Sequence, residues 1–187
     1  MVNSVRNPTE NDDDPRLVQD VEGFENQDAA EPTDPVEFWK AKQRELVTSV
    51  VDYNLSTLAD LIEDKRIDLS PAYQRRFRWD PRRQSLLIES FLMNVPVPPI
   101  FLNEDDLGQY SVIDGKQRLN AVYAMLKGRL MLEGLKVFPD INGKSMDDLP
   151  RDLQTVLKVR PTIRAVVILR QSDADIKFEV FTNQSVI

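Results

Sequence analysis

The sequence contains no cysteine and no histidine. Without cysteine the chain has no disulfides, no thiolate zinc sites and no cysteine nucleophile. Without histidine it has no Ser-His-Asp triad, no imidazole general base and no nuclease site that holds its metal through histidine. Any chemistry of this chain therefore depends on carboxylates, lysine, arginine, amides and backbone groups.

Long apolar runs are also missing, and the chain does not begin with a basic stretch followed by an apolar one. These absences argue against a membrane span and a secretory signal, so we expect a cytoplasmic protein without a membrane partner. The 187 residues are 41% hydrophobic and 29% charged, which is typical of a globular protein. This length allows one domain with a sizeable core, or one domain with a tail.

The net charge of −7 is unevenly distributed. Residues 1–37 carry eleven acids and two arginines, whereas the other 150 residues carry twenty acids and twenty-two bases. Because residues 1–34 hold few large apolar side chains, we expect them to form an acidic disordered leader. The leader is either a solvated tail or a mimic of nucleic acid that shields a basic groove. We assign the domain itself to residues 35–187.

The stretch 110–119, YSVIDGKQRL, is the most informative part of the domain. Its first residues favour a strand, Asp114-Gly115 marks a turn, and apolar residues then recur at helical spacing. A helix start leaves backbone N–H groups unpaired, and Gly115 has no Cβ to hinder a ligand. With Lys116 and Arg118 nearby, this turn is either an anion site or a plain turn in which Asp114 caps the helix.

A second stretch, residues 70–83, carries five arginines and three aromatic residues against one acid. Arginine pairs bidentately with phosphate, and aromatic faces accept bases or guanidinium groups. Asp80-Pro81 is a typical helix start, so Arg82 and Arg83 lie in a first turn, where the helix dipole disfavours cations. This placement suggests a nearby anion or an acidic partner. The alternative is a surface loop whose arginines pair with acids of the domain and whose aromatic residues belong to the core. The two basic helix starts are expected to converge.

The remaining pattern predicts alternating helices and short strands. We expect helices over 35–51, 81–94, 146–159 and 173–181, with Pro150 as the alternative first turn of the third of these. A further helix is expected from a cap at Ser56 or Thr57 to about residue 66, and another from the Asp114-Gly115 turn to about residue 127. Strands are expected over 67–69, 100–102, 110–113 and 162–169, with 110–113 returning antiparallel to 100–102. Residues 129–146 are expected to be a hairpin or an irregular excursion.

Together these stretches resemble the N-terminal domain of GmrSD-type, modification-dependent restriction enzymes, within the ParB/sulfiredoxin-like superfamily. The resemblance covers residues 55 to about 127. It is carried by Tyr73-Gln74-Arg75 with Phe77 and Trp79, by the proline turn 96–100, and by residues 112–119. The order of the pieces makes it more specific than any one of them.

The resemblance implies an α/β (α+β) domain with a small mixed sheet flanked by helices. Its Asp-Gly-Gln-Gln-Arg box is linked to nucleotide binding and hydrolysis in related DNA-defence proteins. Carried over to this chain, Asp114 and Gln117 would be catalytic, and Asp114 would also hold Mg²⁺. The expected phosphate-binding residues are Gly115, Lys116, Arg118, Gln74 and Arg75. The expected DNA or partner contacts are Tyr73, Arg76, Arg78, Arg82 and Arg83.

Two departures from the family pattern matter. Lys116 stands where the family commonly has glutamine, which bears on hydrolysis more than on phosphate binding. The family pattern also continues beyond the segment at which this chain stops, so we expect a domain truncated at its C-terminus. Because the nuclease domain often linked to this family uses histidine, we expect a sensing part without a cutting part.

Three hypotheses follow for the function. The first is a nucleotide-binding sensor domain of a prokaryotic DNA-defence system, with Mg²⁺-dependent triphosphate hydrolysis left open and a nuclease subunit or domain as its partner. The second is a non-enzymatic module that binds DNA or a protein through the arginine-aromatic stretch. The third is a remnant whose box only caps a helix.

Overall fold

The computed structural model describes residues 34–43, 46–69, 79–172 and 177. Five residues of the expected site lie outside this part of the chain: Tyr73, Gln74, Arg75, Arg76 and Arg78. Residues 1–33 of the predicted leader also lie outside it, as does nearly all of the last predicted helix.

A five-stranded mixed sheet forms the centre of the domain, with the order β1-β5-β3-β4-β2. Its strands are β1 (Thr48–Asn54), β2 (Ile67–Asp68), β3 (Ile100–Asp106), β4 (Gln109–Asp114) and β5 (Thr162–Ile168). The β1–β5 and β3–β4 pairs are antiparallel, whereas β3–β5 and β2–β4 are parallel. The predicted hairpin of the third and fourth strands is thus confirmed.

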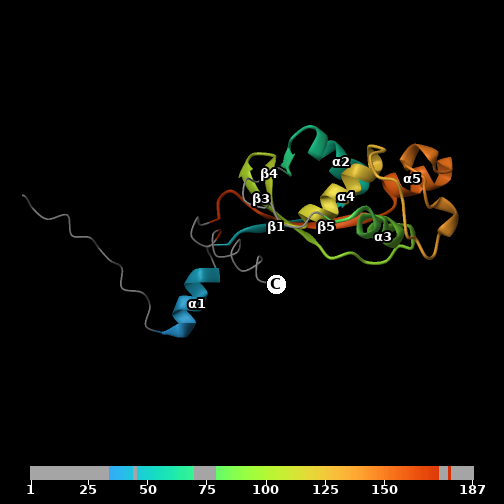
Figure 1. Ribbon diagram of the computed structural model, residues 1–187. Coiled ribbons are helices and arrows are strands. Elements are labelled where there is room, and N and C mark those ends of the chain that lie inside the picture. Colours follow the sequence, from blue (N-terminus) through green and yellow to red (C-terminus); the bar gives the residue numbers. More distant parts are fainter. Residues whose placement is uncertain (1–33, 44–45, 70–78, 173–176, 178–187) are drawn as a thin grey trace, which may run out of the picture.

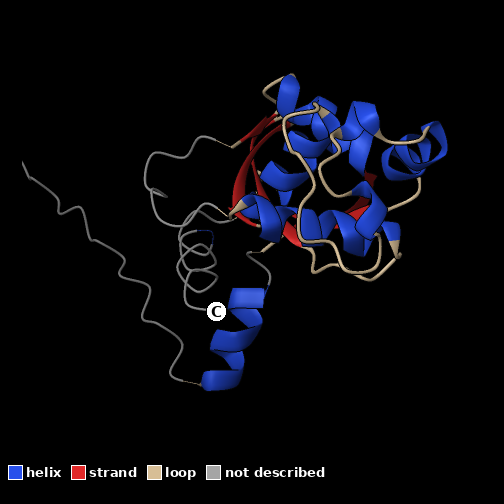
Figure 2. Cartoon of the chain, turned by 45° about the vertical axis from the view of Figure 1, so that its right-hand side comes forward, coloured by secondary structure: helices blue, strands red, loops and turns tan. Residues whose placement is uncertain are grey.

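Helices cover the sheet, and Figure 2 shows them gathered on one side of its curved strands. They are α2 (Leu55–Glu63), α3 (Pro81–Leu92), α4 (Lys116–Leu126) and α5 (Arg151–Val159), with the 3₁₀ turns η1 (Pro139–Ile141) and η2 (Met146–Asp148). A further helix, α1 (Pro35–Gln43), stands apart from this body in both views (Figures 1 and 2). The expected α/β (α+β) class, a small mixed sheet flanked by helices, is confirmed. Within the described residues no helix is long and apolar enough to cross a bilayer.

The core lies between the sheet and these helices. Alternate residues of β5, including Ile163 and Ala165, are buried, as the two-residue period of a strand requires. Leu58 of α2 and Leu119 of α4 are fully buried on the facing helices. Burying one such leucine stabilises the fold by about 1.5–3 kcal/mol, so the N-terminal turn of α4 is held by packing on the sheet.

Three predicted boundaries were wrong. Residues 48–51, expected in a helix, belong to β1, because β-branched Thr48, Val50 and Val51 suit a strand and β5 offers a pairing edge. Asn54, not Ser56 or Thr57, caps α2: its Oδ1 accepts the backbone N–H of Thr57 at 2.8 Å. The helix expected from residue 146 begins as a 3₁₀ turn, and α5 starts after Pro150, which has no N–H to continue the ladder.

Candidate functional site

The predicted strand-turn-helix is present in the structure. β4 ends at Asp114, Gly115 takes the left-handed φ of 94°, and α4 begins at Lys116. Glycine tolerates this φ because it has no Cβ to collide with the backbone. The chain therefore reverses from strand to helix within a single residue.

The missing side chain of Gly115 makes room for the core. A Cβ at this position would overlap Ile100 Cγ2 and lie 2.9 Å from Ile100 Cβ. The sequence suggested that this space would admit a ligand, but in the structure Ile100 fills it. The glycine thus lets the α4 turn pack against the start of β3.

Arg118 and Asp114 form an ion pair across the turn. Arg118 Nη2 donates to Asp114 Oδ2 at 2.8 Å and to the carbonyl oxygen of Pro99 at 3.1 Å. The arginine side chain is 15% exposed and that of Asp114 49% exposed, while Arg118 Nε is buried without a partner. The carboxylate therefore binds Arg118. It does not cap α4, although the plain-turn interpretation requires Asp114 to do so.

The first turn of α4 carries no side-chain cap. Leu119 N–H is the first amide that bonds within the helix, to the carbonyl oxygen of Gly115. The N–H groups of residues 116–118 therefore have no acceptor among the described residues, as at an uncapped helix start. Partial positive charge at this end, together with the ammonium group of Lys116, attracts anions.

The two informative stretches meet at Trp79. Its backbone N–H donates to Gln117 Oε1 at 3.1 Å, and its carbonyl oxygen accepts from Gln84 Nε2 at 2.8 Å. The starts of α3 and α4 are therefore adjacent, as the sequence suggested. Gln117, expected to be catalytic, is engaged in this link.

Arg82 and Arg83 lie in the first turn of α3, which Asp80 caps by accepting the N–H of Arg83 at 2.7 Å. The Arg83 guanidinium lies over the Trp79 ring, 4.7 Å from its centroid. Both arginines are exposed, and neither pairs with a carboxylate within the described part of the chain. Among the described residues, no acid of the domain neutralises these two arginines, as the alternative required.

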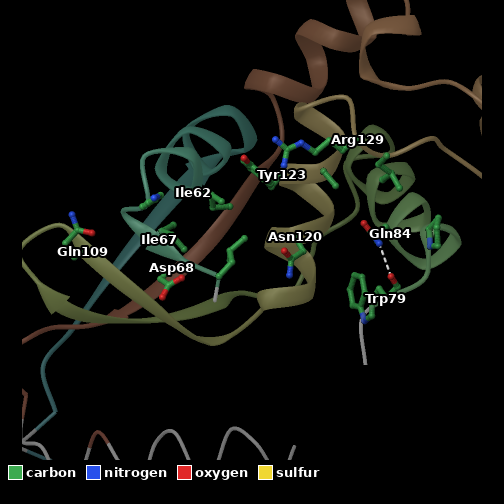
Figure 3. A pocket seen from close by; sticks show the side chains of 14 residues that line it. Ile62, Ile67, Asp68, Trp79, Gln84, Gln109, Asn120, Tyr123 and Arg129 are labelled. Carbon is green, nitrogen blue, oxygen red and sulfur yellow. Dashed lines mark hydrogen bonds between the residues drawn. The ribbon is translucent and has the colours of Figure 1, made fainter. Parts of the chain in front are cut away.

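A pocket of about 1060 Å³ opens beside α4. It lies between α4, the start of α3, and the C-terminal end of α2 with β2 (Figure 3). Its wall includes Ile67, Trp79, Gln84, Asn120, Tyr123 and Arg129. The wall combines aromatic rings, amide groups, the basic side chains of Lys65 and Arg129, and the carboxylate of Asp68.

None of these residues was among the predicted site residues, and Asn120, Tyr123 and Arg129 matter most for what the pocket can bind. The Asn120 amide makes no hydrogen bond with the described residues, and Figure 3 shows it facing the pocket. The Arg129 guanidinium lies over the Tyr123 ring, 5.2 Å from its centroid. The available signal was the spacing of Lys116, Asn120 and Tyr123, which places these residues on one helix face. Arg118, two residues from Asn120, lies on the nearly opposite face.

The expected Mg²⁺ ligand, Asp114, does not belong to a cluster of three or more acids in the described part of the chain. Among the described residues no group of three or more acidic side chains could hold a metal ion. Asp114 Oδ2 is paired with Arg118, whereas Oδ1 has no protein partner in the described residues. Mg²⁺ is commonly bound through one or two carboxylates and the phosphates of a substrate, so a single carboxylate fits only a metal that arrives with a nucleotide.

Comparison with known proteins identifies the family. Residues 58–185 match the domain described as GmrSD restriction endonuclease, N-terminal domain. No curated protein and no solved structure shows significant similarity to the chain. The matched range includes the α4 turn, the pocket wall and the arginine-aromatic stretch, and it covers more than half of the 187 residues. The chain therefore belongs to the family of N-terminal domains of GmrSD restriction endonucleases, which gives it a role in a restriction system.

Proposed function

We propose that this domain binds a nucleoside triphosphate as the sensing part of its restriction system. The most direct support is that Lys116, at the start of α4, lies on the same face of this helix as the residues of α4 that line the pocket. An uncapped helix start favours phosphate, and the neighbouring pocket has the mixed apolar and polar lining that small-molecule sites use.

In this proposal the α4 N–H groups and Lys116 bind the phosphates. Arg118 adds charge at the same turn, but Asp114 and the Pro99 carbonyl hold its guanidinium, so it acts on the ligand only if that ion pair opens. Gln74 and Arg75, outside the described residues, are proposed as further phosphate contacts. Gly115 contributes through its backbone conformation, which forms the turn that exposes the N–H groups at the start of α4.

Hydrolysis is a separate step of the proposal. Mg²⁺ brought in with the nucleotide would be held by Asp114 Oδ1 and would neutralise phosphate charge. A role for Gln117 in orienting water requires its side chain to leave the Trp79 N–H. Binding and turnover are therefore expected to respond differently to changes at this residue.

A second candidate function, contact with DNA or an acidic partner, is favoured by the unpaired arginines of α3. Arg82 and Arg83 are exposed and lie without carboxylate partners in the described part of the chain. Tyr73, Arg76 and Arg78 are proposed to extend this surface. DNA binding of this kind weakens steeply with salt, because phosphate contacts release counterions.

Thermal unfolding with the common triphosphates tests nucleotide binding. A ligand present at a hundredfold excess over Kd stabilises the folded state by about 2.7 kcal/mol. For a domain of this size that corresponds to an increase in Tm of about 5 °C or more. Lys116→Ala should remove most of this increase in Tm. The control Lys158→Ala removes the same charge from an exposed position of α5 and should leave the increase unchanged.

Two results decide between the functions. No Tm shift with any ribo- or deoxyribonucleoside triphosphate, with or without Mg²⁺, would rule out nucleotide binding by this chain. Loss of DNA affinity in an Arg82→Ala/Arg83→Ala variant with unchanged nucleotide affinity would assign α3 to DNA contact.

A further inference from the structure

We infer that the pocket beside α4 holds the nucleobase of the bound triphosphate, and that Asn120 pairs with the edge of that base. The inference rests on the proposed nucleotide binding and extends it to an assigned base site. It concerns Asn120 and Tyr123, which lie beyond the Asp114–Arg118 box, together with Trp79 at the end of the arginine-aromatic stretch.

The first support is the position of the pocket along α4. An α-helix rises about 1.5 Å per residue, so Asn120 lies about 6 Å and Tyr123 about 10 Å beyond Lys116 along the axis. Because residues at i, i+4 and i+7 share a face, the three side chains form one row. A nucleotide with its phosphates at the helix start would extend its sugar and base along this row into the pocket.

The second support is the unused hydrogen-bonding capacity of Asn120. Its amide offers a donor and an acceptor side by side, and both lack a partner among the described residues. The amide atoms of this partly buried side chain remain accessible to solvent, so a ligand can pair with them without breaking a hydrogen bond within the described part of the protein. A nucleobase edge presents adjacent donors and acceptors that an asparagine can pair with bidentately.

Gln84 contributes less to base recognition. Its Nε2 already donates to the Trp79 carbonyl oxygen, which leaves only its Oε1 to accept a hydrogen bond. The amide of Gln109 lies at the far end of the pocket (Figure 3). Of the Asn120 and Gln84 amides, only that of Asn120 can therefore offer a complete donor–acceptor pair. This makes it the variant with the sharpest expected effect.

The third support is the aromatic lining. Tyr123 and Trp79 both line the pocket, and each carries an arginine guanidinium over one ring face. Arg129 covers Tyr123, and Arg83 covers Trp79. A ring held in this way loses little further freedom when a base stacks on it, and stacking on aromatic side chains is a general mode of base binding.

Calorimetric titration of the full chain with two kinds of probe tests the inference. The first kind is the set ATP, GTP, CTP and UTP, and the second is inorganic tripolyphosphate, which carries the phosphates without a base. The wild-type chain should bind at least one nucleotide more tightly than tripolyphosphate. Asn120→Ala should lower that nucleotide's affinity about tenfold and leave tripolyphosphate affinity unchanged.

Matched variants isolate the base contact. Gln109→Ala removes an exposed amide at the far end of the pocket and should not change either affinity (Figure 3). Asn120→Leu keeps a similar volume and removes both the donor and the acceptor without adding charge, so it should lower nucleotide affinity and leave tripolyphosphate affinity unchanged. This variant keeps the test decisive if Asn120→Ala impairs folding.

The outcomes separate the inference from the proposed function. Equal affinity for nucleotide and tripolyphosphate, unaffected by both Asn120 variants, would overturn the base site and leave phosphate binding standing. Parallel loss of both affinities in Asn120→Leu would show that Asn120 supports the fold or the phosphates and not the base. If neither probe binds the wild-type chain, the proposed function and this inference both fail.

Discussion

The backbone N–H of Trp79 donates a hydrogen bond to Gln117 Oε1 at 3.1 Å. This bond joins the end of the arginine-aromatic stretch to the first turn of α4, so the two motifs that identify the family are physically connected. The same contact places Trp79 at the edge of the pocket. Gln117 is thereby a structural link as well as a proposed catalytic residue.

Breaking this link should cost a modest amount of stability. Gln117→Ala leaves the Trp79 N–H without its side-chain acceptor, and a typical hydrogen bond contributes about 0.5–1.5 kcal/mol. Gln117→Glu retains an acceptor and should unfold near the wild-type midpoint in urea. Equal loss of stability in the two variants would show that the hydrogen bond is not what Gln117 contributes.

Gly115→Ala should destabilise the domain more than the same change at Gly143. Both glycines have positive φ, 94° and 77°, but a Cβ at Gly143 would meet nothing within 4 Å. Both variants carry the cost of a left-handed residue, about 1–2 kcal/mol, whereas Gly115→Ala adds a clash with Ile100 worth about 1–3 kcal/mol. Urea denaturation of both proteins measures the difference, and similar losses would mean that the α4 turn relaxes away from β3.

Glu89 should prove important for the loop that follows α4. This carboxylate is 4% exposed, and its Oε1 accepts the backbone N–H groups of Lys136, Val137 and Phe138 at 2.7–3.1 Å. Hydrogen bonds to a charged group contribute about 1.5–3 kcal/mol each, so Glu89→Ala should lower the free energy of unfolding by about 3 kcal/mol or more. Glu89→Gln keeps an acceptor and should lose less.

The control for Glu89 is Glu133→Ala, which removes an exposed carboxylate from the same segment of the chain. Its unfolding midpoint should stay close to that of the wild type. A Glu89→Ala protein as stable as this control would contradict the assignment of Glu89 as the anchor of residues 136–138.

The Asp52–Arg164 pair should give the domain part of its sensitivity to acid. Arg164 Nε and Nη2 donate to the two carboxylate oxygens at 3.0 and 3.1 Å, joining β1 to β5. These hydrogen bonds lower the pKa of Asp52 below its usual value, with the charge of Arg164 acting in the same direction. Because the pKa of Asp52 is lower in the folded than in the unfolded protein, the pair stabilises the fold at pH values above the unfolded pKa of about 3.9. This stabilisation is lost as the pH falls through the pKa of the folded state.

In Asp52→Asn the free energy of unfolding should therefore fall less steeply below about pH 4 than in the wild type. Near neutral pH its dependence on pH should be almost unchanged. Chemical denaturation at about six pH values between about 2.5 and 7 measures how the free energy of unfolding depends on pH. The control is Asp140→Asn, which changes an exposed carboxylate. An unchanged acid slope in Asp52→Asn would exclude the pair as a contributor. The effect should also shrink in high salt, since both side chains are solvent-accessible.

Local sequence signals determined much of the fold. Asp80-Pro81 encodes the start of α3 through a side-chain cap and a preset proline φ, and both act within one helical turn. The alternation in β5 and the Asp-Gly turn before α4 are equally local. Residues 48–51 were misassigned because their strand form depends on the partner β5, more than 100 residues later in the chain.

The box itself could be read from the sequence, because a strand, a glycine and a helix start are contiguous features. The pairing of Arg118 with Asp114 is likewise local, because the two residues are four positions apart. The hydrogen bonds of Arg118 to the Pro99 carbonyl and of Gln117 to the Trp79 N–H could not be predicted, because they depend on how β3 and α3 pack against α4. The pocket was decided wholly by tertiary structure. Its wall comes from α2, β2, α3, α4 and Arg129, and hydrophobic packing of helices on a mixed sheet, which no local pattern specifies, brings them around one space.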